Sequence, residues 1–369
     1  MAVPLLDLKL QYATIREEVR QAVDEVLDSQ RCLAGPHRPK LEASLAAYCG
    51  CTHGLGVASG TDALLCALMA MDVAAGDEVI TTAFTFFATC GAVARVGARP
   101  VFVDIEPDTF NMDPAAVERA ITPRTKAIIP VHLFGQCADM TAIMAIAKKH
   151  GLEVLEDAAQ AIGAKHRGQP ACSFGRAGCL SFYPTKNLGA MGDAGMIVST
   201  DAEFLLKCGV IRVHGDTGGY THVRMGGNFR MDELQAAALN VKFKHLDSWT
   251  TARRANATQY NELLCGISGV VTPVIRPENQ SVYNQYVIRA QRRNELKAFL
   301  AGRKIDSAIY YPTGLHVQKV FEYLGYKMGD FPQTNRAADE VLALPIFPEL
   351  KPEQIREVAG AIREFYQKQ

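Results

Sequence analysis

The chain has 369 residues, more than one hydrophobic core usually organises, so we expect one large domain and one smaller domain. Basic and acidic side chains both number 39, which gives a formal net charge of zero and no charged arm for nucleic acid or for an acidic membrane. These bulk properties favour small-molecule ligands over either of those partners.

The first residues contain no basic segment followed by a long apolar run, so they do not resemble a signal peptide. The longest uncharged stretch, 79–94, is shorter than the roughly 20 residues of a membrane span. The ten cysteines lie among mostly apolar neighbours and lack the CxxC spacing of zinc and redox sites. We therefore expect reduced core cysteines, no metal site and a cytoplasmic location.

Short β-branched runs alternate with helical segments through the first part of the chain. The predicted strands are, in chain order, 55–59, 78–82, 99–105, 125–131, 152–157, 177–182 and 195–200. This alternation is typical of a mostly parallel sheet covered by helices. Ligands of such folds collect at the carboxyl ends of the strands, which is where we look for chemistry.

A long helical pattern follows, from "MDELQAAALNVKFKHLDSW" through "ARRANATQYNELL". Its length predicts a helix that connects two parts of the molecule. We place a large domain at residues 1–249 and a small, mixed α/β C-terminal domain at residues 250–369.

Three places in the predicted sheet carry candidate chemistry. The turn "SGTDAL" ends one strand and opens a helix, so the free N–H groups near Gly60 and Thr61 favour an anion, although Thr61 or Asp62 could simply cap the helix. Asp157 follows the buried run 152–155, which puts its carboxylate at a ligand-facing strand end; the alternative is another helix cap. The third place is the loop "SFYPTKNLGAMGDAG".

Lys186 lies in that loop, five residues after Ser181, and is either a solvated surface group or a nucleophile. An anion cradle, a buried acid, a hydroxyl and a lysine together match the needs of pyridoxal phosphate (PLP). The lysine forms a Schiff base with the PLP aldehyde, a carboxylate pairs with the pyridinium nitrogen, and N–H and O–H donors hold the phosphate.

At these residues the sequence resembles the DegT family of sugar aminotransferases, which are fold-type-I PLP enzymes. The resemblance covers essentially the whole chain, and it implies an α/β fold with a large PLP-binding domain and a smaller C-terminal one. The motifs that carry it include "SGTDAL", "GDEVITTAFTFFAT", "EDAAQAIGA", "SFYPTKNLGAMGDAG", "GGNFRMDELQAA", "YYPTGLHVQ" and "LALPIFPEL".

The resemblance implies a role for each residue at the cofactor. Lys186 would bond the PLP aldehyde, Asp157 the pyridinium nitrogen and Gln160 the ring hydroxyl. The remaining cofactor contacts would be Ser181, Gly60 and Thr61 at the phosphate and Phe86 on the ring face, although Phe86 taken alone reads as a core aromatic.

Asn228 in "GGNFRMDE" matches an asparagine that, in the family, reaches across a dimer interface to the neighbour's phosphate. The resemblance therefore implies a homodimer with shared active sites.

Within the family, "SFYPTKNLGAMGD" looks more like enzymes that aminate the C3 ketone of a UDP- or dTDP-linked sugar with glutamate as donor. Tyr311 and His316 are candidates for the sugar's surroundings, and Arg230 for the donor carboxylate or the diphosphate, because guanidinium binds such anions bidentately. All three also have ordinary structural interpretations.

Four alternatives remain to be weighed. One is a C4 aminotransferase, and another is a non-catalytic regulatory protein that keeps the fold. A sugar dehydratase of the same family would have histidine in place of Lys186, and an NAD-dependent oxidoreductase would need a GxGxxG turn that the sequence lacks.

Overall fold

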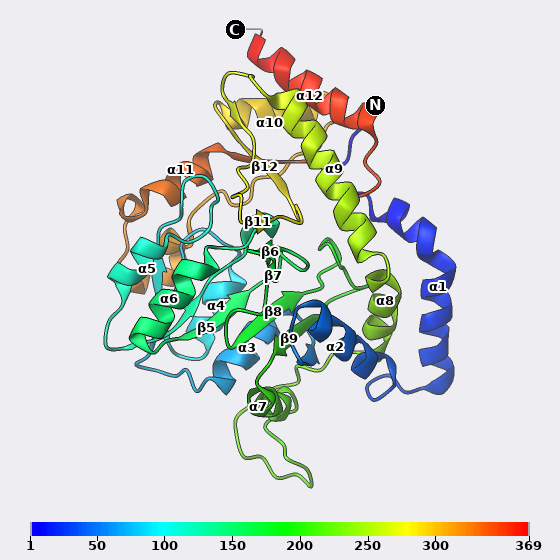
Figure 1. Ribbon diagram of the computed structural model, residues 1–369, viewed down its shortest axis with the longest axis vertical. Coiled ribbons are helices and arrows are strands. Elements are labelled where there is room, and N and C mark those ends of the chain that lie inside the picture. Colours follow the sequence, from blue (N-terminus) through cyan, green and yellow to red (C-terminus); the bar gives the residue numbers. More distant parts are fainter. Residues whose placement is uncertain (1, 368–369) are drawn as a thin grey trace.

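A seven-stranded sheet forms the centre of the computed structural model, which describes residues 2–367 (Figure 1). Its strand order is β1-β9-β8-β5-β4-β2-β3. The strands are β1 (His53–Val57), β2 (Glu78–Thr82), β3 (Arg99–Val103), β4 (Thr125–Ile129), β5 (Glu153–Asp157), β8 (Ala177–Ser181) and β9 (Gly195–Ser199). All seven correspond to strands predicted from the β-branched runs.

The sheet is mostly parallel, as predicted. β3, β2, β4, β5 and β8 pair in parallel, whereas β9 runs antiparallel to both β8 and β1. Parallel strands start from one edge of the sheet and end at the other, so the segments that follow β2, β4, β5 and β8 are brought to the same edge.

Alternating side chains of the strands face two helical layers, because successive residues of a strand point to opposite faces. Leu155, Cys179 and Ile197 pack with α3 (Gly60–Ala70), α4 (Ala88–Arg95) and α7 (Ala202–Arg212). The opposite face is covered by α2 (His37–Tyr48) and α8 (Glu233–Phe243) at one end and by α5 (Pro114–Ala120) and α6 (Met140–His150) at the other. Both faces of the sheet are therefore buried.

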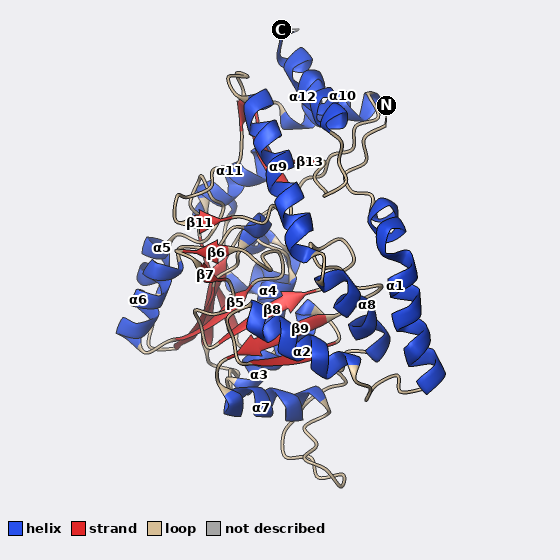
Figure 2. Cartoon of the chain, turned by 45° about the vertical axis from the view of Figure 1, so that its right-hand side comes forward, coloured by secondary structure: helices blue, strands red, loops and turns tan. Residues whose placement is uncertain are grey.

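The predicted connecting helix is two helices, α8 and α9 (Leu246–Leu264), interrupted at Lys244 and His245. Figures 1 and 2 show α9 rising from α8 toward the C-terminal region, as a connector should. α1 (Leu8–Ser29) lies beside α8, where Ile15 and Val19 pack against residues of α8 and against Trp249 of α9. The sequence predicted that this helical stretch connects two parts of the molecule, but it did not predict the break between α8 and α9.

The C-terminal region has its own core. Its antiparallel sheet, in the order β10 (Val270–Val271), β12 (Tyr286–Ala290), β13 (Val341–Leu344), is accompanied by α10 (Arg293–Gly302), α11 (Pro332–Glu340) and α12 (Pro352–Gln367). Val3 pairs with Ile305 and packs in the same core, so the first residues of the chain join its C-terminal part. The proposed boundary at residues 249 and 250 stays a prediction.

The remaining elements are short. A small sheet has the order β11 (Asn279–Gln280), β6 (Lys165–His166), β7 (Gln169–Pro170). The 3₁₀ helices are η1 (Leu133–Gly135), η2 (Leu315–Val317), η3 (Lys319–Leu324) and η4 (Met328–Asp330). No helix within residues 2–367 is long and apolar enough to cross a membrane. Of the ten free cysteines, Cys32 and Cys265 are exposed and the others are buried.

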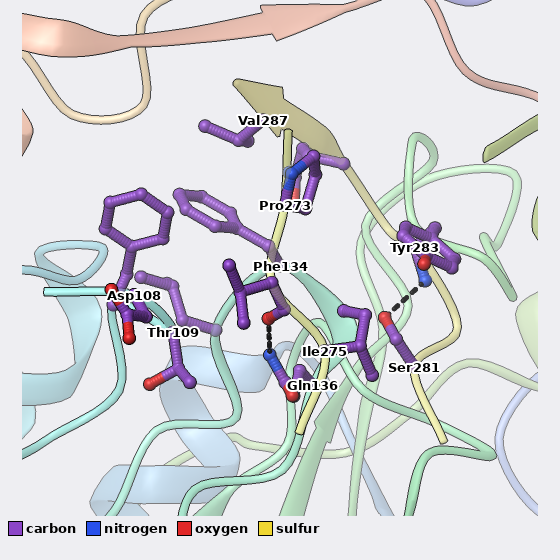
Figure 3. Close-up of a pocket in the computed structure, with 13 residues that line it drawn as sticks. Asp108, Thr109, Phe134, Gln136, Pro273, Ile275, Ser281, Tyr283 and Val287 are labelled. Carbon is purple, nitrogen blue, oxygen red and sulfur yellow. Dashed lines mark hydrogen bonds between the residues drawn. The ribbon is translucent and has the colours of Figure 1, made fainter. Parts of the chain in front are cut away.

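A small hollow marks the junction between the central sheet and the C-terminal region (Figure 3). Asp108, Thr109 and Phe134 line it from one side, and Pro273, Ile275, Tyr283 and Val287 line it from the other. Its volume is about 20 Å³, which is the space of roughly one water molecule. The hollow is a small gap in the packing between the central sheet and the C-terminal region. It is far too small for a cofactor.

Candidate active site

A much larger cavity, of about 770 Å³, lies at the carboxyl edge of the central sheet. The segments that follow β2, β4, β5 and β8 form its floor, and residues 310–318 of the C-terminal region close it from above. Most of the site residues predicted from the sequence line this cavity: Gly60, Thr61, Phe86, Asp157, Gln160, Ser181, Lys186 and Tyr311. The fold therefore gathers residues that are far apart in the chain.

Lys186 lies in the loop between β8 and β9, and its side chain is half-buried in the cavity wall. The backbone N–H of Lys186 donates to the carbonyl oxygen of Tyr183 (2.8 Å), which closes a tight turn. Burial lowers the pKa of the lysine amine to about 8, because it disfavours the charged form, while the nearby Asp157 acts in the opposite direction. Part of the amine is consequently neutral, and nucleophilic, near physiological pH.

Asp157 ends β5, and its carboxylate is almost wholly buried in the cavity floor. Oδ2 accepts a hydrogen bond from the Thr89 hydroxyl (2.8 Å), and Oδ1 accepts one from the backbone N–H of Ala159 (3.1 Å). Burial raises the pKa of Asp157, whereas those two hydrogen bonds and the positive charge of Lys186 lower it. Turns rather than a helix follow Asp157, so the helix-cap alternative is wrong.

Gln160 is fixed between the sheet and the C-terminal region. Its Oε1 accepts from the backbone N–H of Phe134 (2.7 Å), and its Nε2 donates to the Tyr311 hydroxyl (3.2 Å). Tyr311 also packs edge-on against Phe84, with ring centroids 5.9 Å apart. Of the three candidate substrate residues, Tyr311 is the one that the structure brings to the cavity.

An anion cradle forms where α3 begins. Ser59 caps the helix by accepting from the N–H of Asp62 (3.0 Å), so neither Thr61 nor Asp62 is the cap. Because an α-helix leaves its first N–H groups without intrahelical partners, Gly60 and Thr61 offer donors at the cavity. A side chain at position 60 would lie 2.6 Å from Cβ of Ser181, so only glycine lets Ser181 approach.

Phe86 lies on the cavity rim with 59% of its surface exposed, so it is not the core aromatic that the residue alone suggests. Its ring is tilted against Tyr311, with the centroids 6.5 Å apart. An apolar ring that is exposed inside a cavity is suited to cover a planar ligand.

Three predicted residues do not line this cavity. Asn228 is exposed, in the extended segment that follows α7, and pairs through its backbone with Val213. Arg230 pairs through its backbone with Val57, and its Nε is buried without a hydrogen-bond partner among the described residues. His316 is buried and packs edge-on against Phe331, with centroids 4.8 Å apart. Within one chain, His316 has the structural surroundings of a core residue.

The sequence interpretation also missed residues of the site. Thr89 lies in the quoted motif "FTFFAT", one helical turn after Thr85, and this spacing could have indicated that both hydroxyls share a face. Their Oγ1 atoms are 3.3 Å apart. Gln285, whose buried Oε1 has no hydrogen-bond partner within the described chain, lines the cavity without any local signal in the sequence.

The comparisons with known proteins agree with this geometry. The model of the DegT/DnrJ/EryC1/StrS aminotransferase family matches residues 13–363. A pleiotropic regulatory protein of Geobacillus stearothermophilus is 55% identical over 99% of both chains. A UDP-N-acetyl-3-dehydro-alpha-D-glucosamine 3-aminotransferase of Acidithiobacillus ferrooxidans is 46% identical over 98% of this chain and 97% of its own. The crystal structure of DesV from S. venezuelae has a TM-score of 0.97 and 42% identity, with 99% of both chains covered.

The cavity and these matches define the class, a fold-type-I PLP-dependent aminotransferase. The chain belongs to the DegT/DnrJ/EryC1/StrS family, which confirms the family, the fold and the cofactor predicted from the sequence.

The residues present fit PLP. The cradle at Gly60 is closed to any side chain, the amine of Lys186 has a lowered pKa, and a carboxylate is buried opposite it. Within residues 2–367, no group of three or more His, Cys, Asp or Glu side chains is placed to hold a metal ion.

Proposed function

We propose that the protein moves the amino group of L-glutamate to the C3 keto carbon of a UDP- or dTDP-linked sugar. The observation that carries this proposal is the pairing of Lys186 and Asp157 in one cavity beside an anion cradle. Several relatives whose names specify a nucleotide sugar are named for the 3-position, as in the Acidithiobacillus aminotransferase and in a dTDP-3-amino-3,4,6-trideoxy-alpha-D-glucose transaminase of Streptomyces venezuelae.

Each cavity residue has a role toward the cofactor in this proposal. Lys186 would bind the aldehyde carbon, Asp157 would pair with the pyridine nitrogen, Gln160 would bond the ring hydroxyl and Phe86 would cover the ring. Ser181 and the N–H groups of Gly60 and Thr61 would hold the phosphate. When bound, PLP supplies an electron sink that lets a Cα–H bond of the amino donor break.

Lys186 also moves the proton. Its amine, whose pKa burial lowers to about 8, would carry a proton between the Cα of the amino donor and the cofactor. Burial raises the pKa of Asp157, and the hydrogen bond from Thr89 and the charge of Lys186 act against that rise. Thr89 orients that carboxylate through its hydrogen bond.

The proposed active site is shared between two chains. Among the described residues, the charged side chains that line the cavity are Asp157, Lys186 and Asp193, so that part of the chain offers a single cation for a cofactor phosphate and a sugar diphosphate. Asn228 and Arg230 lie outside it, in a segment that is exposed at Asn228. We propose a homodimer in which this segment of one chain reaches the partner's cavity, with Asn228 at the phosphate and Arg230 at an anionic substrate group.

Tyr311 is the proposed contact to the sugar, because its hydroxyl lies in the cavity and its position is fixed by Gln160. His316 would reach a sugar only if the ring left its contact with Phe331. A single experiment identifies the nucleotide, the sugar and the carbon atom, C3 or C4, that receives the amine.

Purified protein loaded with PLP is given L-glutamate and a panel of 3-keto and 4-keto sugars linked to UDP or dTDP, and the products are identified by mass spectrometry and NMR. We expect a 3-amino sugar nucleotide. A 4-amino product would contradict the C3 assignment. The name of the Geobacillus relative favours a second candidate, a regulatory protein, and a loaded protein that aminates no member of the panel would support it.

A further inference from the structure

The loop that carries Lys186 separates two cavities. Tyr183, Thr185 and Lys186 face the active-site cavity. Pro184, Ala190 and Met191 face a second cavity, of about 230 Å³, on the side of α1 and α8. The loop therefore has a cavity on each side. Contacts with neighbouring elements are needed to hold it against the active site.

Lys242 of α8 lines this second cavity and is 4% exposed. Its ammonium group donates a hydrogen bond to the carbonyl oxygen of Gly189, three residues after Lys186. Burial lowers its pKa to about 8, and no carboxylate among the described residues offsets that effect. A buried amine without a counter-charge is costly, and an apolar residue would usually serve the fold better, so this lysine calls for another explanation.

The same face of α8 holds the loop at a second point. Gln235, seven residues before Lys242 and thus two helical turns away, accepts from the backbone N–H of Met191 through Oε1 (2.9 Å). Closer to Lys186, Asn187 donates to the carbonyl oxygen of Val282 (2.9 Å). The three ties lie at residues 187, 189 and 191, all on the C-terminal side of the reactive lysine, and two of them come from α8.

The loop is also tightly folded at Gly189. A side chain there would lie 2.2 Å from the carbonyl oxygen of Pro184, so the turn 184–189 closes on itself and behaves as one unit. A displacement of the Gly189 carbonyl therefore also moves Lys186, which lies within that turn.

We propose that Lys242 is a positioning residue for Lys186. Its hydrogen bond to Gly189 holds the turn 184–189 toward the active-site cavity, so that the amine of Lys186 stays opposite Asp157. Without it the turn relaxes into the cavity behind and withdraws the amine from its reaction partner. The inference rests on the proposed role of Lys186 as the residue that bonds PLP.

The test compares Lys242→Met with Lys244→Met. Lys244 lies two residues further on, is largely exposed and forms an ion pair with Glu18 (2.9 Å), so its replacement makes the same charge change away from the loop. The rate at which PLP-free protein acquires the covalent cofactor link is followed by visible absorbance, and borohydride reduction with mass mapping locates the link. Non-covalent PLP affinity, melting temperature, KM and kcat are measured beside it.

We expect Lys242→Met to slow the covalent step and to lower kcat at least about tenfold, with PLP affinity and KM little changed, while Lys244→Met matches the wild type. Lys242→Arg, which keeps a donor for Gly189, should recover part of the rate. A Lys242→Met protein that melts earlier but links PLP at the wild-type rate would show a merely structural lysine and overturn the proposal.

If Lys242→Met does not fold, Gln235→Leu removes the other tie from α8 at a partly exposed position. A wild-type rate in that variant would likewise contradict the claim that α8 sets the position of the loop. Failure of the wild-type protein itself to link PLP would instead refute the role proposed for Lys186.

Discussion

Two regions of the molecule contribute differently to the proposed site. In the wall formed by the ends of β5 and β8 and the start of α3, the carboxylate of Asp157 is already held by hydrogen bonds from Thr89 and Ala159. The segment 213–230 extends from α7 at the bottom of Figure 1 and exposes Tyr220 (93%) and Met225 (85%). The wall residues come together within one chain, whereas the segment exposes large apolar side chains, a feature of surfaces that bind partners.

This difference separates the region proposed for the chemistry from the region proposed for substrate specificity. The residues proposed for PLP chemistry belong to the wall, and the groups proposed to complete the anion sites belong to the extended segment. The following predictions test that division, beginning with the reactive lysine of the wall.

Lys186→Ala should abolish the covalent link and reduce transamination by a factor of about 10⁴ or more, because the nucleophile and the proton carrier are lost together. The fold should persist, because the side chain is only half-buried at the cavity. Visible absorbance of PLP-saturated protein and intact mass after borohydride reduction measure the outcome. A wild-type protein that stays colourless with PLP would already contradict the assignment.

The wall was also the predictable region. Gly60, Asp157, Ser181 and Lys186 each stand beside a strand end, and parallel strands bring such ends together without further information. Thr89 and Gln285 were missed because their roles depend on tertiary contacts rather than on position in a strand. The break between α8 and α9 was missed because the apolar pattern continues through Lys244 and His245.

Asp157→Asn should reduce turnover by about 10²-fold or more, the usual loss when one preorganised electrostatic group is removed from an active site. The amide keeps the shape of the carboxylate; its oxygen can accept from the N–H of Ala159 while its NH2 donates to the Thr89 hydroxyl, so stability should change little. Turnover and thermal unfolding are measured on one preparation. Full turnover with lowered stability would assign Asp157 a structural role only.

Thr89→Val removes the hydroxyl that donates to Asp157 and so raises the pKa of this carboxylate further. A hydrogen bond to a charged group is worth about 1.5–3 kcal/mol, which predicts a loss of roughly tenfold or more in kcat/KM. Because the carboxylate exists above its pKa, the acid limb of the pH profile should move to higher pH.

Thr85→Val is the matched control, since Thr85 contacts the hydroxyl of Thr89 and makes no hydrogen bond with Asp157 among the described residues. Thr89→Ser should restore the wild-type profile. An unshifted acid limb in Thr89→Val would refute the link between Thr89 and Asp157.

The extended segment is tested by mixing two inactive variants, Lys186→Ala and Asn228→Ala. In a heterodimer with shared sites, both lesions fall in one site and the other site is wholly wild-type. Activity should return to at most about half the wild-type level per heterodimer if the sites act independently. Native mass spectrometry confirms the exchange. Confirmed heterodimers without activity would place Asn228 in its own chain's site.

The most direct test of the account is the half-reaction with L-glutamate alone. PLP-loaded wild-type protein should lose its visible absorbance and release one equivalent of 2-oxoglutarate per site. Lys186→Ala should release none. An unchanged spectrum and no 2-oxoglutarate from the loaded wild-type protein would contradict amino transfer from glutamate.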